Sequence, residues 1–328
     1  MTGQLLARAA AVAVLATLTM AAAQAPAAAQ SYPDRTVRII VPTSPGGSID
    51  TVTRVIAEKV SGKWGKPVII ENRPGAGMRI GVDAAAKSPA DGYTLVVAHD
   101  GAFALNPLFY PDLPYDSQKN FAPVAMLAKI PDVIMVNASV PAKSVKELIE
   151  LAKKEPGKLN HATGGPGGLI ALELFKSMAK VDIVSVQYRG AAPSIAGMMA
   201  GQVQICMTDL ASAQAGMQSD RVRTLAVTSL KRAKRFPNLP TADETGLPGY
   251  EIGVWIGMFA PAGTPADVIK KIEAGVKEAV AMRDVRDRLE AMGVDLRTGT
   301  ADELRTSLAD DLQKYGKLIK EQNIKIGQ

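Results

Sequence analysis

Short apolar segments alternate with amphipathic ones along most of the chain. Runs rich in β-branched residues predict strands at Thr36 to Val41, Val68 to Glu71 and Tyr93 to Ala98. Between the first two, a helix is predicted to begin near Ser48, a residue suited to an N-cap. Its apolar positions recur at helical spacing and are Val52, Val55, Ile56 and Val60. This order is typical of a parallel sheet covered by helices.

The same alternation continues to the C-terminus. Further strands are predicted at Val133 to Val136, Ile183 to Tyr188, Ile205 to Thr208 and Thr224 to Thr228. Capping boxes at Ser144 with Glu147 and at Thr300 with Glu303 predict two helix starts, and Thr264-Pro265 predicts a third. The predicted terminal helix carries an apolar stripe made of Leu304, Leu308, Leu312, Tyr315 and Ile319. The fold class is therefore α/β.

Two longer apolar stretches frame the middle of the chain, Phe121 to Leu127 and Ile252 to Ala260. They predict strands that cross between two α/β lobes. The first lobe is then discontinuous and comprises 31–128 plus 257–328, whereas the second comprises 129–256. A chain of this length has enough residues for two separate cores.

Residues 1–30 differ from the rest because Arg8 is their only charged residue and an alanine-rich apolar run follows it. This is the pattern of a signal peptide, with cleavage predicted near Ala29 to Ser31 and a periplasmic destination. The single cysteine, Cys206, rules out an intramolecular disulfide. The net charge of +6 is spread among 32 acidic residues, and no basic stripe interleaved with aromatics predicts nucleic-acid binding.

Groups suited to catalysis are scarce. His99 and His161 are the only histidines, so no metal site is expected, and the nucleophile elbow G-x-S-x-G is absent. Gly75 to Gly81 has one residue too many for a dinucleotide fingerprint, and there is no phosphate-loop lysine motif. We expect no catalytic residue and no cofactor.

Three glycine-rich turns each follow a strand and open a helix, at Pro42 to Ser48, Thr163 to Gly168 and Tyr188 to Pro193. The first N–H groups of a helix lack internal partners and attract a carboxylate, and glycine lets a ligand approach the backbone. Glycines alone also make tight turns. The recurrence of three such turns, two in one lobe and one in the other, favours a ligand cleft between the lobes.

Other polar residues near these strand ends have two readings each. His99, Asp100 and Gly101 follow the third strand, where the histidine is either a cleft residue or a structural one. Asp209 is either a ligand acceptor or a helix cap. Arg79 and Arg189 could pair with an anion. A competing hypothesis is a secreted hydrolase or isomerase that uses His99 and Asp100 as acid and base.

Several ordered motifs resemble a known family. They are Tyr32-Pro33, Pro42 to Asp50, Asn72 to Gly77, Asp91 to Leu95, Asn106-Pro107, Tyr188 to Pro193, Gly201 to Val203 and Ala260 to Pro265. From Tyr32 onward the chain resembles the Bug-type extracytoplasmic solute receptors of the tripartite tricarboxylate transporter family. The resemblance implies a type II periplasmic-binding-protein fold, two α/β lobes joined by crossing strands that close like a flytrap. It implies a monomeric receptor, not an enzyme, for a small organic carboxylate, with a membrane permease or sensor as partner.

The resemblance also implies a set of ligand-binding residues. In the first lobe these are Ser44, Gly46, Gly47, Asp50, His99, Asp100 and Gly101, and in the second lobe Thr163, Gly164, Gly165, Pro166, Gly167, Gly190, Ala191, Ala192 and Asp209. The chain departs from the family pattern at Met78-Arg79 and after Gly165. Asp100 adds a negative charge beside the site, which favours a ligand with an amino or hydroxyl group next to its carboxylate.

Overall fold

The computed structural model of the protein describes residues 32–188, 190–291, 294 and 299–324. Met1–Asp34 and Arg35–Gln328 are two separate units, and all helices and strands below belong to the second. The predicted signal peptide and Arg189 lie outside the described residues. Within the described part, no helix combines the length and the apolar character that crossing a membrane requires.

The strands are β1 (Val37–Val41), β2 (Val68–Asn72), β3 (Thr94–His99), β4 (Phe121–Asn137), β5 (Asn160–Thr163), β6 (Val184–Gln187), β7 (Ile205–Asp209), β8 (Val222–Val227) and β9 (Gly253–Pro261). The longer helices are α2 (Ser48–Trp64), α3 (Arg79–Ala86), α5 (Val145–Lys154), α6 (Pro166–Ala179), α7 (Ala191–Met199), α8 (Leu210–Met217), α9 (Ala266–Ala281), α10 (Arg283–Glu290) and α11 (Ala301–Glu321). Shorter turns of helix are η1 (Ala76–Met78), η2 (Gly101–Leu105) and α4 (Asn106–Phe109).

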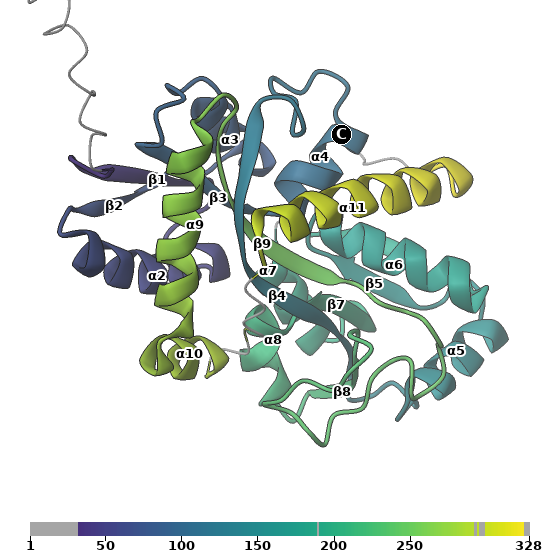
Figure 1. Ribbon diagram of the computed structural model, residues 1–328. Helices are drawn as coiled ribbons and strands as arrows, with labels where there is room; N and C mark the ends of the chain where they lie inside the picture. The colour runs from purple at the N-terminus through teal and green to yellow at the C-terminus, as the bar shows by residue number, and fades with distance from the viewer. Residues whose placement is uncertain (1–31, 189, 292–293, 295–298, 325–328) are drawn as a thin grey trace, which may run out of the picture. The chain divides into compact units, whose positions relative to one another are not determined.

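The strands form a single sheet in the order β2-β1-β3-β9-β4-β7-β5-β6, with β8 also paired to β4 (Figure 1). Strands β1, β2 and β3 are mutually parallel, as are β5, β6 and β7. The long strand β4 joins these two groups because it pairs with β9 over residues 121–131 and with β7 over 132–136. This mixed α/β sheet agrees with the alternation of segments in the sequence.

Strand β4 unites two segments that the sequence predicts as separate strands, Phe121 to Leu127 and Val133 to Val136. Lys129 and the pair Pro131-Asp132 interrupt the apolar pattern without ending the strand. Gly253 lies opposite Pro131 in β9, and an added Cβ on Gly253 would lie 2.5 Å from the Ile130 carbonyl oxygen. The backbones of β4 and β9 therefore approach closely at this point.

Two apolar clusters lie in the two halves of the sheet. The first gathers Ile40, Val96, Phe103 and Phe259, in which Phe103 stacks on Phe259 with ring centroids 3.9 Å apart. The second gathers residues of β4, β7 and β8 with those of α5 and α6, and Phe175 and Tyr250 are among its largest members. Helix α11 contributes Leu304 and Leu308 to the first cluster, and Tyr315 and Leu318 to the second. The exact lobe boundaries stay a prediction.

Helix starts agree closely with the capping signals. Ser144 caps α5 by accepting a hydrogen bond from Glu147 N, and Thr300 forms a complete capping box with Glu303. At α2 the N-cap is Gly47 rather than Ser48, and no side chain caps this end. Asp50, the third residue of the helix, instead accepts the Gly46 N–H with its carboxylate, which ties the preceding loop to the first turn.

Candidate functional site

The strand directions bring the predicted ligand-binding loops of the two halves toward each other. Strand β3 is parallel to β4, because both are antiparallel to β9, and its last residue His99 lies opposite Ile256. Strand β7 is antiparallel to β4, and its last residue Asp209 lies opposite Asp132. The carboxyl ends of β3 and β7 therefore point at the same stretch of β4 from opposite sides. Strands β1 and β5 end in the same directions as β3 and β7.

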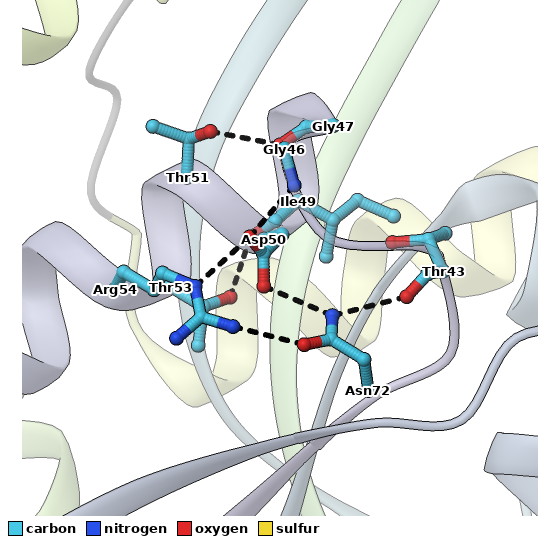
Figure 2. Close-up of polar contacts among 9 residues, drawn as sticks. All are labelled: Thr43, Gly46, Gly47, Ile49, Asp50, Thr51, Thr53, Arg54 and Asn72. Carbon is cyan, nitrogen blue, oxygen red and sulfur yellow. Dashed lines mark hydrogen bonds and ion pairs between the residues drawn. The ribbon is translucent and has the colours of Figure 1, made fainter.

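Asp50, in the first turn of α2, is the centre of a hydrogen-bond network that joins this helix to the loop before it and to the end of β2 (Figure 2). One carboxylate oxygen accepts hydrogen bonds from Gly46 N and Arg54 Nε, both at 2.9 Å. The other accepts from Asn72 Nδ2 at 2.9 Å, and Asn72 also donates to the Thr43 carbonyl at 3.0 Å. Burial opposes ionisation of Asp50, but the bonds from Arg54, Gly46 and Asn72 outweigh it and hold its pKa below the ordinary value.

This network determines which groups of the loop can meet a ligand. The Gly46 N–H is already bonded to Asp50, and Gly46 itself has φ +87°. Ser44, Gly46 and Gly47 are exposed, whereas Asp50 is 3% exposed. The first N–H groups of α2, beginning at Ser48, have no acceptor within the helix. Asp50 therefore positions the loop, and the exposed groups around Gly47 are those a ligand can reach.

The two glycine turns of the other half lie against each other. Helix α6 begins after Gly165 with φ +141°, and α7 begins after Gly190 with φ +109°. A Cβ on Gly164 would lie 2.9 Å from the Gly190 carbonyl carbon and 3.0 Å from Ser194 Oγ. Side chains at Gly164 are thus excluded by packing. The structure brings Gly164 and Gly190 together, as a site shared by both turns requires.

Thr163 is fully buried and bonded beneath these turns. Its Oγ1 lies 3.0 Å from His161 Nδ1 and 2.8 Å from Ser185 Oγ. His161 Nε2 accepts a hydrogen bond from Met207 N at 3.0 Å, which places the ring proton on Nδ1. Burial lowers the pKa of His161 to about 3, so the ring is neutral. Both side chains support the β5–α6 turn from within the core.

His99 and Asp100 lie at the end of β3. His99 Nδ1 accepts a hydrogen bond from Gly101 N at 2.9 Å, so the neutral ring carries its proton on Nε2. Gly101 is close to this ring, since an added Cβ would lie 2.5 Å from His99 Cε1. Asp100 is 4% exposed, and its Oδ1 is buried without a hydrogen-bond partner. Nδ1 of His99 lies 3.4 Å from that oxygen.

Asp132 was missed from the sequence and joins this group. It is 5% exposed and lies opposite Asp209, whose Oδ1 caps α8 by accepting from Ser212 N at 2.9 Å. Burial, followed by the charges of Asp209 and Asp100, raises the pKa of Asp132 well above its ordinary value. The only signal in the sequence is a single carboxylate between Pro131 and an apolar run, which is uncommon in a buried strand.

Arg79 is engaged within its own loop. Its Nε donates to the Ala76 carbonyl at 2.7 Å, and its guanidinium lies 4.0 Å from the centre of the Tyr110 ring. Arginine side chains often stack on aromatic rings in this way. The two tryptophans pack as well: Trp255 is 4% exposed and donates to Asp311 Oδ2 at 2.7 Å, and Trp64 lies close to Gly275.

A cavity of about 960 Å³ lies beside the crossing strands, lined by Lys129 to Pro131, the loop 229–235, residues 251–255 and parts of α10 and α11. None of the predicted ligand-binding residues, all of which the structure describes, lines it. Among the described residues no three carboxylate, histidine or cysteine groups are arranged to hold a metal ion.

The fold defines the class of protein. The sheet is mixed, and long strands pass from one α/β lobe to the other. This is the architecture of the periplasmic binding proteins. The solved structures that resemble this chain include a periplasmic transporter and the periplasmic binding protein BugD. The predicted fold class is confirmed by these relatives.

Residues 52–324 match the family described as tripartite tricarboxylate transporter family receptor, and the chain belongs to this family. It is 32% identical over 305 residues to protein BugT of Bordetella pertussis, covering 92% of this chain and 94% of BugT. The predicted Bug-type resemblance is thus confirmed. The family consists of solute receptors.

Two solved relatives contain a ligand. R. palustris Rpa4515 with adipate is 32% identical, with a TM-score of 0.80, and the match covers 88% of this chain and 97% of that one. MatC from Rhodopseudomonas palustris with bound malate is 30% identical, with a TM-score of 0.76, covering 88% and 100%. Both ligands are small dicarboxylates.

Proposed function

We propose that the protein is a periplasmic receptor that captures a small organic carboxylate between its two lobes, without turning it over, and presents it to a tripartite tricarboxylate-type permease or to a sensor. The observation that carries this proposal is the placement of three glycine turns, each opening a helix, at strand ends that point toward one another. Periplasmic location is supported by the family and by the signal-peptide pattern of residues 1–30.

Helix N-termini suit a carboxylate because their N–H groups and dipoles offset its charge without a cationic partner. Exposed Gly47 and the turns at Gly165 and Gly190 leave such N–H groups uncovered by side chains. The dicarboxylates bound by Rpa4515 and MatC support the same ligand class here. Closure of the lobes on the ligand would then be the state that a membrane partner recognises.

The test is a thermal-shift screen of the mature protein against mono-, di- and tricarboxylates, including adipate and malate. A binding acid should raise the melting temperature with concentration and be recovered unchanged. If no organic acid changes the melting temperature, the proposal is wrong. Conversion of the acid, lost in His99→Ala, would instead support the secreted hydrolase or isomerase.

A variant of the first loop tests the location. Gly47 has φ −75°, and a Cβ there would meet only the Ser44 carbonyl oxygen at 3.8 Å, so Gly47→Val should fold normally. Its side chain would cover the N-terminus of α2 and weaken binding at least tenfold. Gly62→Ala, on the exposed face of the same helix with no neighbour within 4 Å, is the matched control and should bind as the parent does.

A further inference from the structure

The cavity beside the crossing strands has one wall from each predicted lobe. Strands β4 and β9 line its base, and the loop 229–235 of the predicted second lobe forms one wall. The other wall comes from α10 and from residues 307–315 of α11. Both helices are tied to the first lobe, since Lys59 in α2 pairs with Asp284 in α10, and Leu308 of α11 packs in the first cluster. A change in the angle between the lobes therefore changes the distance between these walls.

The two walls carry charges of opposite sign. Among the described lining residues of the second lobe, five are cationic and one, Glu251, is acidic, which gives a net charge of +4 at pH 7. The cations are Lys129, Lys231, Arg232, Lys234 and Arg235. Among those of the first lobe, one, Lys314, is cationic and four are acidic, which gives a net charge of −3. The acids are Asp287, Glu290, Asp310 and Asp311. Charges that are mixed along the chain are thus separated by sign across this cavity.

Two contacts already join the walls. Lys234 Nζ lies 3.8 Å from Glu290 Oε1, and Lys314 Nζ donates a hydrogen bond to the Glu251 carbonyl oxygen at 2.8 Å. Lys231 is exposed and forms no ion pair with another described residue, so its charge also acts on the opposite wall. The walls are therefore close enough for their charges to interact.

The interaction between the walls is collective. An exposed ion pair such as Lys234 with Glu290 contributes little by itself. The net charges of the walls act together, because a cavity of about 960 Å³ is on the order of one Debye length wide, about 8–10 Å at 0.1–0.15 M salt. Buried Ile130 and Trp255 at its base reduce the screening, since the effective dielectric constant is lower beside apolar groups. The walls attract each other, and added salt weakens this attraction.

We infer that the attraction between the charged walls helps to set the angle between the two lobes and, through that angle, the affinity for the solute. None of the predicted ligand-binding residues lines the cavity, so the walls act on the solute only through the movement of the lobes. By linkage, a solute that brings the walls together gains affinity from their attraction, and one that separates them loses affinity. The effect on affinity rests on the proposed function, whereas the effect on the angle does not.

Spin labels on the two walls measure the distance between them by double electron–electron resonance. Leu230→Cys and Arg286→Cys place the labels at exposed positions of the loop and of α10. The natural Cys206 is buried and should stay unlabelled. In the labelled parent, added salt should lengthen this distance, because it screens an attraction.

Reversal of the loop charges gives the opposite response to salt. With three substitutions together, both walls are negative and repel each other, so the distance should be several ångströms longer than in the parent and should shorten when salt is added. The three are Lys231→Glu, Lys234→Glu and Arg235→Glu.

A matched control reverses three exposed lysines of the same lobe that do not line the cavity, Lys143, Lys146 and Lys158. This variant should keep the distance and the salt response of the parent. Melting temperatures show whether each variant is folded. If the distance responds neither to reversal of the loop charges nor to salt, the inference is wrong.

Calorimetry with adipate, with malate and with the acid that gives the largest thermal shift tests the effect on affinity. Reversal of the loop charges should change the affinity of a binding acid at least threefold. Binding should weaken if the acid shortens the distance between the labels in the parent, and tighten if the acid lengthens it.

A change of the opposite sign overturns the inference, and so does an acid that binds without moving the labels; in both cases the proposed function stands. If none of the acids binds, the proposed function fails, and the distances and their response to salt decide the inference alone.

Discussion

Both carboxylate oxygens of Asp50 are bonded within the protein, so its effect on a ligand is indirect. It joins Gly46, Arg54 and Asn72 and so determines the path of the loop before α2. The sequence placed Asp50 among ligand-binding residues because it stands in the family motif, and that role stays a prediction. Side-chain bonds between β2 and α2 could not be read from spacing, since Asn72 is 22 residues away in sequence.

Replacement of Asp50 by asparagine should destabilise the protein by about 1–3 kcal/mol at pH 7, because bonds to a charged acceptor are lost. The folded pKa is below the unfolded one, so this stability is present above about pH 4. It is lost as the pH falls through the folded pKa, and the difference between parent and variant should narrow there. Urea unfolding at several pH values measures it.

Asp287→Asn is the matched control for Asp50→Asn, because Asp287 forms a pair with Arg283 at the same spacing of four residues but is 67% exposed. Exposed pairs contribute little, so this variant should change the free energy of unfolding by less than about 0.5 kcal/mol. Equal effects of the two substitutions would contradict the role of the Asp50 network.

His161 should make the protein acid-sensitive. Its pKa is about 3 in the folded protein and 6.5 in the unfolded chain, so the unfolded state binds the proton more tightly. The neutral ring contributes its full stability above pH 6.5, and the contribution decreases by about 1.4 kcal/mol per pH unit as the pH falls toward 3. His161→Gln removes this titration, and its unfolding free energy should depend less steeply on pH between 6 and 4.

Two features separate this effect from others. Above pH 7 the unfolding free energies of the parent and of His161→Gln should change with pH in parallel, because His161 is then neutral in both the folded and the unfolded state. Asp132 acts in the opposite sense, since its raised folded pKa gives stability at low pH that is lost as the pH rises through that pKa. Parallel profiles between pH 6 and 4 as well would show that His161 does not titrate on unfolding.

Among the strands and helices, those whose apolar residues recur at regular spacing were predictable from the sequence, and those rich in polar residues were not. Strand β1 and helix α2 lie where the apolar spacing put them. Strand β5 was missed because three of its four residues, Asn160, His161 and Thr163, are polar. His161 and Thr163 are nevertheless buried, because they bond to each other and to Met207 N and Ser185 Oγ. Strand β4 was divided because a proline and an aspartate interrupt its pattern, although pairing with β9 and β7 continues through them.

Contact between α3 and the end of β1 depends on Gly81. A Cβ there would lie 2.7 Å from Pro42 Cβ and 2.8 Å from the Arg73 carbonyl oxygen, and neither group can turn away as a flexible side chain would. Gly81→Ala should therefore lower the free energy of unfolding by about 1–3 kcal/mol. Gly62→Ala is the control: with open space around it in α2, it should raise stability by up to about 1 kcal/mol. Chemical denaturation should therefore show changes of opposite sign in the free energy of unfolding for the two substitutions. If both substitutions stabilise the protein, the close packing at Gly81 is contradicted.

At the scale of the whole Arg35–Gln328 unit, two lobes were predictable from the two long apolar stretches, but the role of α11 was not. An apolar stripe identifies the buried face of a helix without identifying what covers it. Leu304 and Leu308 pack in the first cluster, whereas Tyr315 and Leu318 pack in the second. The helix therefore belongs to both halves, in addition to the crossing strands β4 and β9.

Because α11 and two strands are shared, we expect the halves to unfold together. Leu308→Ala and Leu318→Ala each remove a buried side chain, one from each cluster, and each should cost about 2–5 kcal/mol. Tryptophan fluorescence reports the first cluster, to which Trp255 belongs, and helix α2, where Trp64 lies, whereas far-UV circular dichroism reports both halves. In urea, both signals should show one transition that either substitution moves as a whole, whereas Lys317→Ala, at an exposed position of α11, should leave it in place. The contrary result would be two transitions, of which Leu318→Ala shifts only the one that fluorescence does not detect. That result would show that the halves unfold independently and that α11 does not couple them.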